Sequence, residues 1–228
     1  MENGKSAMVT AAVVALIVGG GAGYVIGNSG GDDGNGGKSS SSSAAPATDT
    51  KAADLRVLLN NLEAEHVDLA SAATRAGFDG DKSFAAAAGS LGQNTDDLSV
   101  AVASVYGDEA GAQFKEIWAS HIGFFVDYTV AAKGGDQAGM DKAVQDLNGY
   151  VEAISTFFSG ANPNLPKDAV AQLISEHFGL LKDTVDKHAA GDYEGSYAAQ
   201  AQARDQITTK IADTKAGAIV KQNPGNKF

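Results

Sequence analysis

The chain has 228 residues, contains no cysteine and carries a formal net charge of −11 at pH 7. The lack of cysteine excludes disulfide bonds and thiolate metal sites. A phosphate-binding surface needs clustered lysine and arginine, and the sequence has no such cluster, so the composition also argues against nucleic acid as a partner.

The first predicted element is a membrane-spanning helix near the N-terminus. Residues 6–28 carry no charge, and their apolar stretch of about 20 residues is long enough to cross a bilayer. Lys5 precedes the stretch and Asp32 follows it, which places the N-terminus in the cytoplasm. A cleaved signal peptide is the alternative, but the stretch is long for one and Ala22-Gly23-Tyr24 is a poor cleavage site. We therefore predict an anchor over residues 1–28 and a single-pass protein of the cell membrane whose C-terminal domain lies outside the cytoplasm.

A tether and a folded domain are expected to follow the anchor. Residues 29–51 consist mainly of Gly, Ser, Asp and Ala, which cannot bury much apolar area, so we predict a disordered tether there. Residues 52–221 are rich in alanine and hold no proline before Pro163, which favours helix over sheet. Residues 222–228 are predicted to form a disordered tail.

Three repeats divide the folded region. In each repeat a histidine is followed 14 residues later by glycine and 15 residues later by aspartate, and the histidines are 55 and 56 residues apart. The matched sets are His66 with Gly80-Asp81, His121 with Gly135-Asp136, and His177 with Gly191-Asp192. A fixed period of this kind indicates duplicated structural units. We place their boundaries at about residues 52–107, 108–162 and 163–221.

The Gly-Asp pair predicts a tight turn between two helices in every repeat. Glycine closes the outgoing helix because the left-handed conformation costs it little, and aspartate caps the next helix by accepting from its free N–H groups. Apolar residues recur at helical spacing on both sides of the turns, for example Leu55, Leu59 and Leu62, then Leu91 and Leu98, Phe114 and Ile117, Leu147 and Ile154, Val170 and Ile174, and Ile207 and Ile211. We therefore predict an all-α fold of six helices, three consecutive αα-hairpins that form an up-and-down bundle or, alternatively, a stack of hairpins.

All three repeat histidines fall within the apolar stripe of the first helix of their hairpin. Reflecting each hairpin about its turn predicts the residues that face them: Asn94 and Thr95 for His66, residues 148–150 for His121, and residues 204–206 for His177, with Asp205 as the natural partner. A buried imidazole must find a hydrogen-bond partner or remain uncharged. The histidines can therefore be structural, each fixing the register of its own hairpin.

A metal site is the alternative interpretation of the same histidines. Neutral imidazoles that converge from neighbouring helices suit copper or zinc, with carboxylates completing the set of ligands. The candidate ligands are His66, His121 and His177, with Glu63 or Asp205 as possible carboxylates. Glu63 and His66 also have the Glu-x-x-His spacing of di-iron bundles, but the other repeats have no carboxylate at the equivalent position, which argues against a di-iron site.

The remaining candidate residues have simpler explanations. His188 lies just before the third turn, where the C-terminus of a helix favours a positively charged group. Trp118 and the pairs Phe124-Phe125 and Phe157-Phe158 are expected in the core. The motifs of serine hydrolases, P-loop proteins, dinucleotide-binding proteins and zinc proteases do not occur, and we expect the protein not to be an enzyme.

From about residue 55 to residue 211, the sequence resembles a family of exported helical domains of Gram-positive bacteria. The resemblance is carried by Glu65-His66, residues 94–98, Val105-Tyr106-Gly107, residues 113–128, residues 159–166 and Gly191-Asp192-Tyr193. Members are often labelled copper amine oxidase-like, but the Asn-Tyr-Asp/Glu and His-x-His motifs of that enzyme are absent. Members also tend to have a further histidine near residues 201–206, where this chain has Gln202 and Arg204. The resemblance implies an exported helical module without the oxidase activity.

Two functions stay open from the sequence. The first is a membrane-anchored, non-enzymatic module outside the cytoplasm that binds a partner or ligand, or acts as a sensor or spacer at the cell surface. The second is a metal-binding bundle in which the repeat histidines hold copper or zinc. No protein or small-molecule partner is identified by the sequence. The relative positions of the three histidines separate the two functions.

Overall fold

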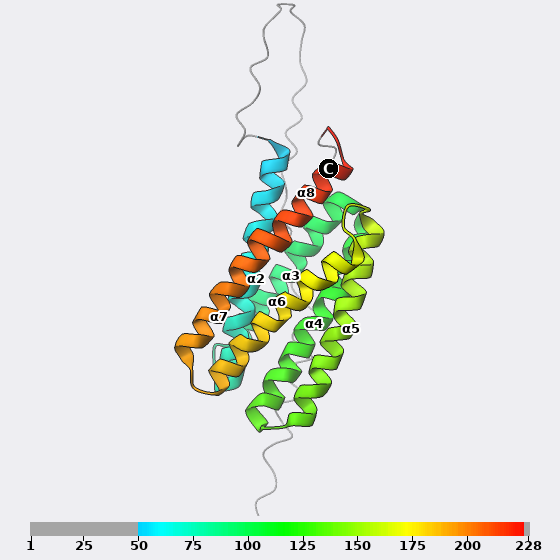
Figure 1. The fold of residues 1–228 in the computed structure, drawn as a ribbon. Helices are drawn as coiled ribbons and strands as arrows, with labels where there is room; N and C mark the ends of the chain where they lie inside the picture. Colours follow the sequence, from blue (N-terminus) through cyan, green and yellow to red (C-terminus); the bar gives the residue numbers. More distant parts are fainter. Residues whose placement is uncertain (1–49, 226–228) are drawn as a thin grey trace, which may run out of the picture.

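The computed structural model describes residues 50–225, and in this range helices are joined only by short turns. The elements are α2 (Lys51–Asp79), α3 (Phe84–Tyr106), α4 (Asp108–Gly134), α5 (Gln137–Ala161), α6 (Lys167–Ala189), α7 (Tyr193–Gln206), the π-helical segment η2 (Ile207–Ala212) and α8 (Asp213–Gln222). The last three elements continue into one another, so residues 50–225 form six helical rods (Figure 1). The described residues contain no strand, and the prediction of an all-α fold is confirmed.

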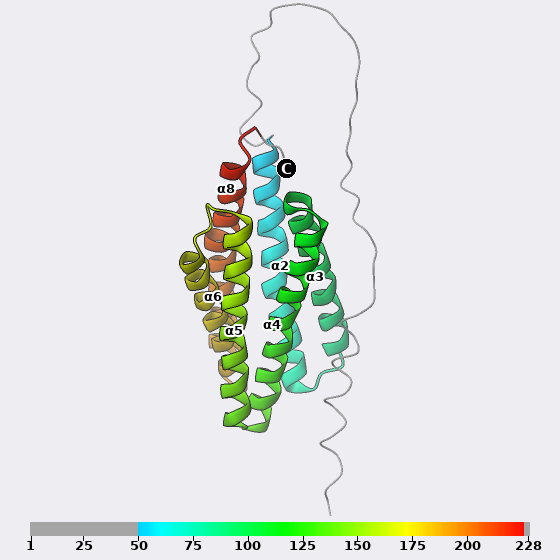
Figure 2. The same ribbon diagram turned by 90° about the vertical axis from the view of Figure 1, so that its right-hand side faces the viewer.

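The six rods run alternately up and down the long axis of an elongated bundle (Figures 1 and 2). Rods that are consecutive in sequence pack against each other, from α2 on α3 to α6 on α7. The last rod then returns to the first, because α7, η2 and α8 all contact α2. Contacts also join α2 to α4, α2 to α6 and α4 to α6. The first helices of the three hairpins therefore meet inside the bundle.

The glycine of every predicted Gly-Asp turn adopts a left-handed conformation, with φ of 74° at Gly80, 66° at Gly135 and 78° at Gly191. Asp136 and Asp192 cap the following helices as predicted, since each side chain accepts from the backbone N–H three residues later. The predicted cap is wrong in the first turn. There Asp81 accepts from the N–H of Ser83 at 2.7 Å, and α3 begins only at Phe84. The loop is longer than the other two, so the aspartate lies outside the first turn of α3.

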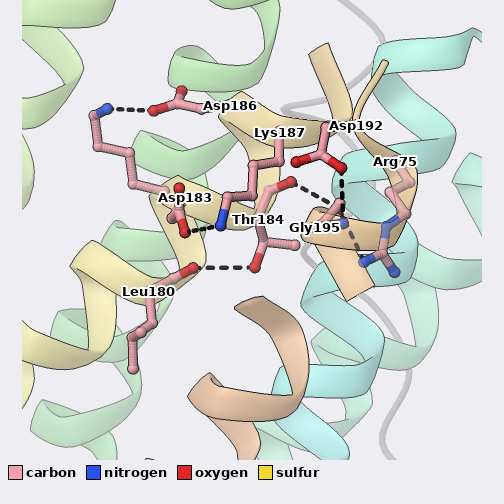
Figure 3. A network of polar contacts seen from close by, with 10 residues as sticks. Arg75, Leu180, Asp183, Thr184, Asp186, Lys187, Asp192 and Gly195 are labelled. Atoms are coloured by element: carbon pink, nitrogen blue, oxygen red, sulfur yellow. Dashed lines mark hydrogen bonds and ion pairs between the residues drawn. The ribbon is translucent and has the colours of Figure 1, made fainter. Parts of the chain in front are cut away.

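A polar network ties the third turn to α2 (Figure 3). Arg75 of α2 donates to Oγ of Ser196 at 3.2 Å and to Oε1 of Gln200 at 2.6 Å. The Ser196 hydroxyl donates to the backbone carbonyl of Thr184 on α6 at 2.8 Å. Asp192, which caps α7, lies in the same network (Figure 3). These bonds join α2, α6 and α7 at one end of the bundle.

The core consists of large apolar side chains from all six rods, and burial of their area is the main stabilising contribution. Trp118 and the pair Phe157-Phe158 are buried in it, as predicted. Phe125 is also buried, whereas Phe124 is partly buried and packs against the same cluster. Trp118 belongs to α4, one of the three helices that meet inside the bundle.

The predicted membrane anchor lies outside the described residues. Residues 1–49 and 226–228 are not described, so the anchor at 1–28, the tether at 29–51 up to residue 49, and the last part of the tail stay predictions. Within residues 50–225, no helix is both long and apolar enough to cross a membrane.

Candidate functional site

The three repeat histidines meet in the interior of the bundle. His66 on α2, His121 on α4 and His177 on α6 line one cavity of about 20 Å³. Their exposed fractions are 1%, 6% and 8%. A cavity of this size holds about one water molecule or one ion. Each histidine has the same place in its hairpin and the first helices of the hairpins pack together, so the duplication brings the three imidazoles to one point.

His66 and His121 are in direct contact across two hairpins. Their Nε2 atoms are 3.4 Å apart, and their ring centroids are 5.3 Å apart with the planes inclined by 51°. Two imidazole nitrogens bound to one tetrahedral metal ion at about 2.0–2.1 Å are separated by about 3.3 Å. A typical hydrogen bond with an N–H donor is shorter, at about 2.7–3.2 Å. The contact is a long hydrogen bond in which either ring can donate, according to its tautomer, and its length is also close to the spacing of two ligands of a shared ion.

His177 is oriented by a glutamine of its own hairpin. Its Nδ1 lies 3.0 Å from Oε1 of Gln206, and the amide nitrogen of Gln206 donates to the carbonyl of Leu173 at 3.0 Å. Because the amide oxygen can only accept, Nδ1 carries the proton and Nε2 is left with a lone pair. This Nε2 is buried and has no hydrogen-bond partner among the described residues.

The first two hairpins place polar or aromatic groups at the corresponding level. Asn94 donates to the carbonyl of Leu62 at 2.9 Å, and Leu62 lies four residues before His66, as its counterpart does in the third hairpin. Asn94 thus faces His66 as predicted. In the second hairpin Tyr150 stacks on His121 with ring centroids 4.6 Å apart. The Nδ1 atoms of both histidines are buried and have no partner among the described residues.

Burial keeps all three imidazoles uncharged near neutral pH. Desolvation lowers the pKa of His66 well below its ordinary value, and the neighbouring imidazoles lower it further. Desolvation also lowers the pKa of His121 to about 3. It lowers the pKa of His177 to about 4, against the opposing effect of the hydrogen bond to Gln206. An uncharged imidazole is the form that binds a metal ion.

A buried ion pair adjoins the histidines. Glu63 on α2 is fully buried, and its Oε1 accepts from the ammonium group of Lys215 on α8. The other carboxylate oxygen, Oε2, has no hydrogen-bond partner among the described residues. Glu63 lines the histidine cavity and also a second cavity of about 20 Å³, which Lys215 lines and the histidines do not. Burial lowers the pKa of Lys215 to about 7.

The π-helical segment allows one rod to supply both Gln206 and Lys215 to the interior. Nine residues separate them, and a regular α-helix would place them about 180° apart around the axis. The extra residue of a π-bulge removes about 100° of this rotation. The hydroxyls of Thr208 and Thr209 both donate to the backbone carbonyl of Asp205, which competes with regular helix bonds at this point.

The structure brings together most of the predicted site residues. The three repeat histidines and Glu63 line the same cavity. The prediction of Asp205 as the partner of His177 is wrong: Asp205 is exposed, and Gln206 takes its place because it lies one residue further around the helix. His188 lies apart from the cavity in the last turn of α6, 2.9 Å from Oδ1 of Asp79.

Sequence reasoning missed Lys215. Its signal is a lysine at an interior position of an apolar stripe formed by Ala212, Ala216 and Ile219, which are buried at helical spacing. A charged residue in such a stripe predicts a buried partner of opposite charge.

The cluster is not a complete metal site in the present side-chain positions. Within residues 50–225, no three His, Cys, Asp or Glu side chains are close enough together to hold one ion. His66 and His121 supply two nitrogens at ligand spacing, and His177 lies across the cavity. A third bond therefore requires Nε2 of His177 to approach the other two nitrogens while its Nδ1 stays bonded to Gln206.

Comparison with models of protein families finds no match, and neither the curated proteins nor the solved structures contain one. The function is therefore inferred from the geometry of the site. The contacts of the three histidines and of Glu63 carry this inference.

Proposed function

We propose that the protein is a non-enzymatic module, anchored to the cell membrane through residues 1–28, whose helical domain outside the cytoplasm binds copper or zinc between His66, His121 and His177. The observation that supports this most directly is the 3.4 Å separation of the Nε2 atoms of His66 and His121 in a buried cavity. The two Nε2 atoms share at most one proton, and Nε2 of His177 in the same cavity has no partner among the described residues; an ion between the three nitrogens would bind all three lone pairs.

The third ligand is Nε2 of His177. The hydrogen bond to Gln206 fixes the proton on Nδ1, which is the role that outer hydrogen-bond partners have in known metal sites. Asn94 lies beside His66 and Tyr150 stacks on His121, but neither takes the place at Nδ1 that Gln206 has at His177. Binding of an ion draws the three imidazoles together and closes the cavity.

The ligand chemistry favours copper or zinc. Imidazole nitrogens suit these ions, whereas magnesium and calcium require mainly oxygen ligands. The chain has no cysteine, so the site contains no thiolate. The cavity of about 20 Å³ admits an ion but not an organic ligand of ordinary size.

A structural role for the histidines is the second candidate. The chain from His177 through Gln206 to the carbonyl of Leu173 favours it, because these bonds fix the register of the third hairpin without any ion. In that case the domain acts as a spacer or binds a partner through its surface. Metal titration separates the two candidates.

The single tryptophan provides the measurement. Trp118 is the only tryptophan of the chain, and its ring centroid lies 4.8 Å from those of His66 and His121. Copper bound there is expected to quench its fluorescence with saturation at one ion per chain, and zinc is expected to compete. The variants His66→Phe and His121→Phe should lose this binding, whereas His188→Gln should retain it. Equal binding by His121→Phe and the wild type would rule out the proposed metal function.

The membrane anchor has a separate test. The full chain with a C-terminal tag is expected in the membrane fraction, with the tag open to protease added outside the cell. A variant that lacks residues 1–28 should leave that fraction. A full chain that stays in the soluble fraction would contradict the proposed location.

A further inference from the structure

We propose that Glu63 is the carboxylate ligand of the histidine site and that Lys215 is the built-in cation that occupies this carboxylate until a metal ion arrives. This inference rests on the proposed metal function. It assigns the fourth ligand and the neighbouring charge that opposes binding of the ion, more strongly for a divalent ion than for a monovalent ion.

Glu63 and His66 present their side chains on the same face of α2. They are three residues apart, so they are neighbours on the helix surface. Both are almost completely buried, at 0% and 1% exposure, and both line the histidine cavity. The carboxylate therefore shares its cavity with all three imidazoles.

The two oxygens of Glu63 have different surroundings. Oε1 accepts from Lys215, whereas Oε2 is buried without a hydrogen-bond partner among the described residues. Buried carboxylate oxygens are normally satisfied by hydrogen bonds or by cations. The carboxylate borders the cavity with the imidazoles and the cavity with Lys215. This unsatisfied oxygen makes Glu63 the carboxylate available to an ion in the histidine cavity, provided that the side chains move closer together than they are in the present positions.

Lys215 is placed to yield to such an ion. It comes from the opposite end of the sequence, and its ammonium group also lies 5.4 Å from the ring centroid of Phe158 and 6.0 Å from that of Trp118. These weak contacts keep the charge near Glu63 without a second carboxylate. The cavity beside Lys215 gives its side chain room to move away from the carboxylate. Within this space the ammonium group and the metal ion compete for one negative charge.

The charges predict how the pair affects different ions. Coulomb energy scales with the charge of the ion, so Lys215 repels a divalent ion about twice as strongly as a monovalent ion in the same place. Removal of Lys215 should therefore raise the affinity for Zn²⁺ more than the affinity for Cu⁺. Removal of the carboxylate should lower the affinity for Zn²⁺ more than the affinity for Cu⁺.

The decisive variant is Glu63→Gln/Lys215→Met in the full chain. It removes one negative and one positive charge, so the net charge is unchanged, and the pair is replaced by side chains of similar size that are expected to fold. We expect its affinity for Zn²⁺, measured by competition with a chromogenic chelator, to fall about 10- to 100-fold because a ligand is lost. An affinity equal to that of the wild type, while His121→Phe still abolishes binding, would overturn the inference and leave the proposed metal function intact.

The single variant Lys215→Met tests the role of the cation. Its affinity for Zn²⁺ should rise about tenfold and its affinity for Cu⁺ about threefold, in keeping with the ratio of the charges. A fall in Zn²⁺ affinity in a folded Lys215→Met protein would also overturn the inference. If this variant does not fold without metal, the double variant decides. A wild-type protein that binds neither ion would refute the metal function itself, and the assignment of Glu63 with it.

Discussion

Acidification from pH 7 to pH 5 is expected to destabilise the domain through its three buried histidines. In the unfolded chain each imidazole has a pKa near 6.5 and takes up a proton as the pH falls below that value. In the folded domain desolvation lowers the pKa of His121 to about 3 and that of His177 to about 4, so these groups stay neutral. The unfolded state then binds more protons, and stability falls as the pH decreases between about 6.5 and 4.

The magnitude follows from the pKa difference. At pH 5 each histidine lies about 1.5 pH units below its unfolded pKa, which corresponds to about 2 kcal/mol. His121 and His177 together give about 4 kcal/mol, and the lowered pKa of His66 adds to this loss. This loss is comparable to the whole free energy of unfolding of an ordinary domain, which is about 5–15 kcal/mol. The domain should therefore approach its unfolding transition near pH 5.

Urea unfolding between pH 7 and pH 5, followed by circular dichroism in a chelating buffer, measures the effect. The variant His121→Phe should reduce the slope of the unfolding free energy against pH by about 1.2 kcal/mol per unit between pH 5 and pH 6. The comparison with wild type cancels the contributions of the carboxylates. If the free energy of unfolding of His121→Phe depended on pH as steeply as that of the wild type, the reasoning would be refuted.

Three further changes test the packing, each by urea unfolding. Lys215→Ala should lower the free energy of unfolding by about 3–5 kcal/mol, because it leaves the carboxylate of Glu63 buried without a cation. The double variant Glu63→Gln/Lys215→Met should lower it by less than about 1 kcal/mol. Equal decreases in the two proteins would contradict this. Gly111→Ala should cost about 1–3 kcal/mol, since the new Cβ would lie 2.7 Å from a side-chain carbon and 2.9 Å from a backbone oxygen of α3. Gly179→Ala, where a Cβ meets nothing within 4 Å, should instead stabilise α6 by about 0.5–1 kcal/mol, and a loss there would show that the space is absent.

The hairpins could be predicted because their signals are local. A glycine at the end of one helix and an aspartate at the start of the next act within a few residues, and the repeated spacing to His66 and its counterparts fixes the unit. The reflection of each hairpin about its turn also placed Asn94 and Tyr150 correctly. In the third hairpin the reflected range of residues 204–206 was also correct, and only the choice of Asp205 within it was wrong by one residue. Since one residue is about 100° of rotation, this error exchanged exposed Asp205 for buried Gln206.

The contacts between hairpins could not be predicted in this way. The contact of His66 with His121 depends on how two separate hairpins pack, which no local pattern specifies. The pairing of Glu63 with Lys215 further requires the π-helical segment, and a π-bulge has no clear signature in the sequence. Half of the candidate site therefore follows from the repeat, and the other half from the tertiary arrangement of the three units.

The closing contact of the last rod with the first sets an order on folding. Glu63 and Lys215 are 152 residues apart, so a chain synthesised from its N-terminus exposes the carboxylate long before its cation is available. Burial of an unpaired carboxylate is unfavourable, and the interior around α2 is expected to stay hydrated until α8 arrives. Individual hairpins can form early, but the complete bundle forms only when α8 has packed against α2. A domain built from three similar units is in this respect a single cooperative body, completed by its last turns of helix.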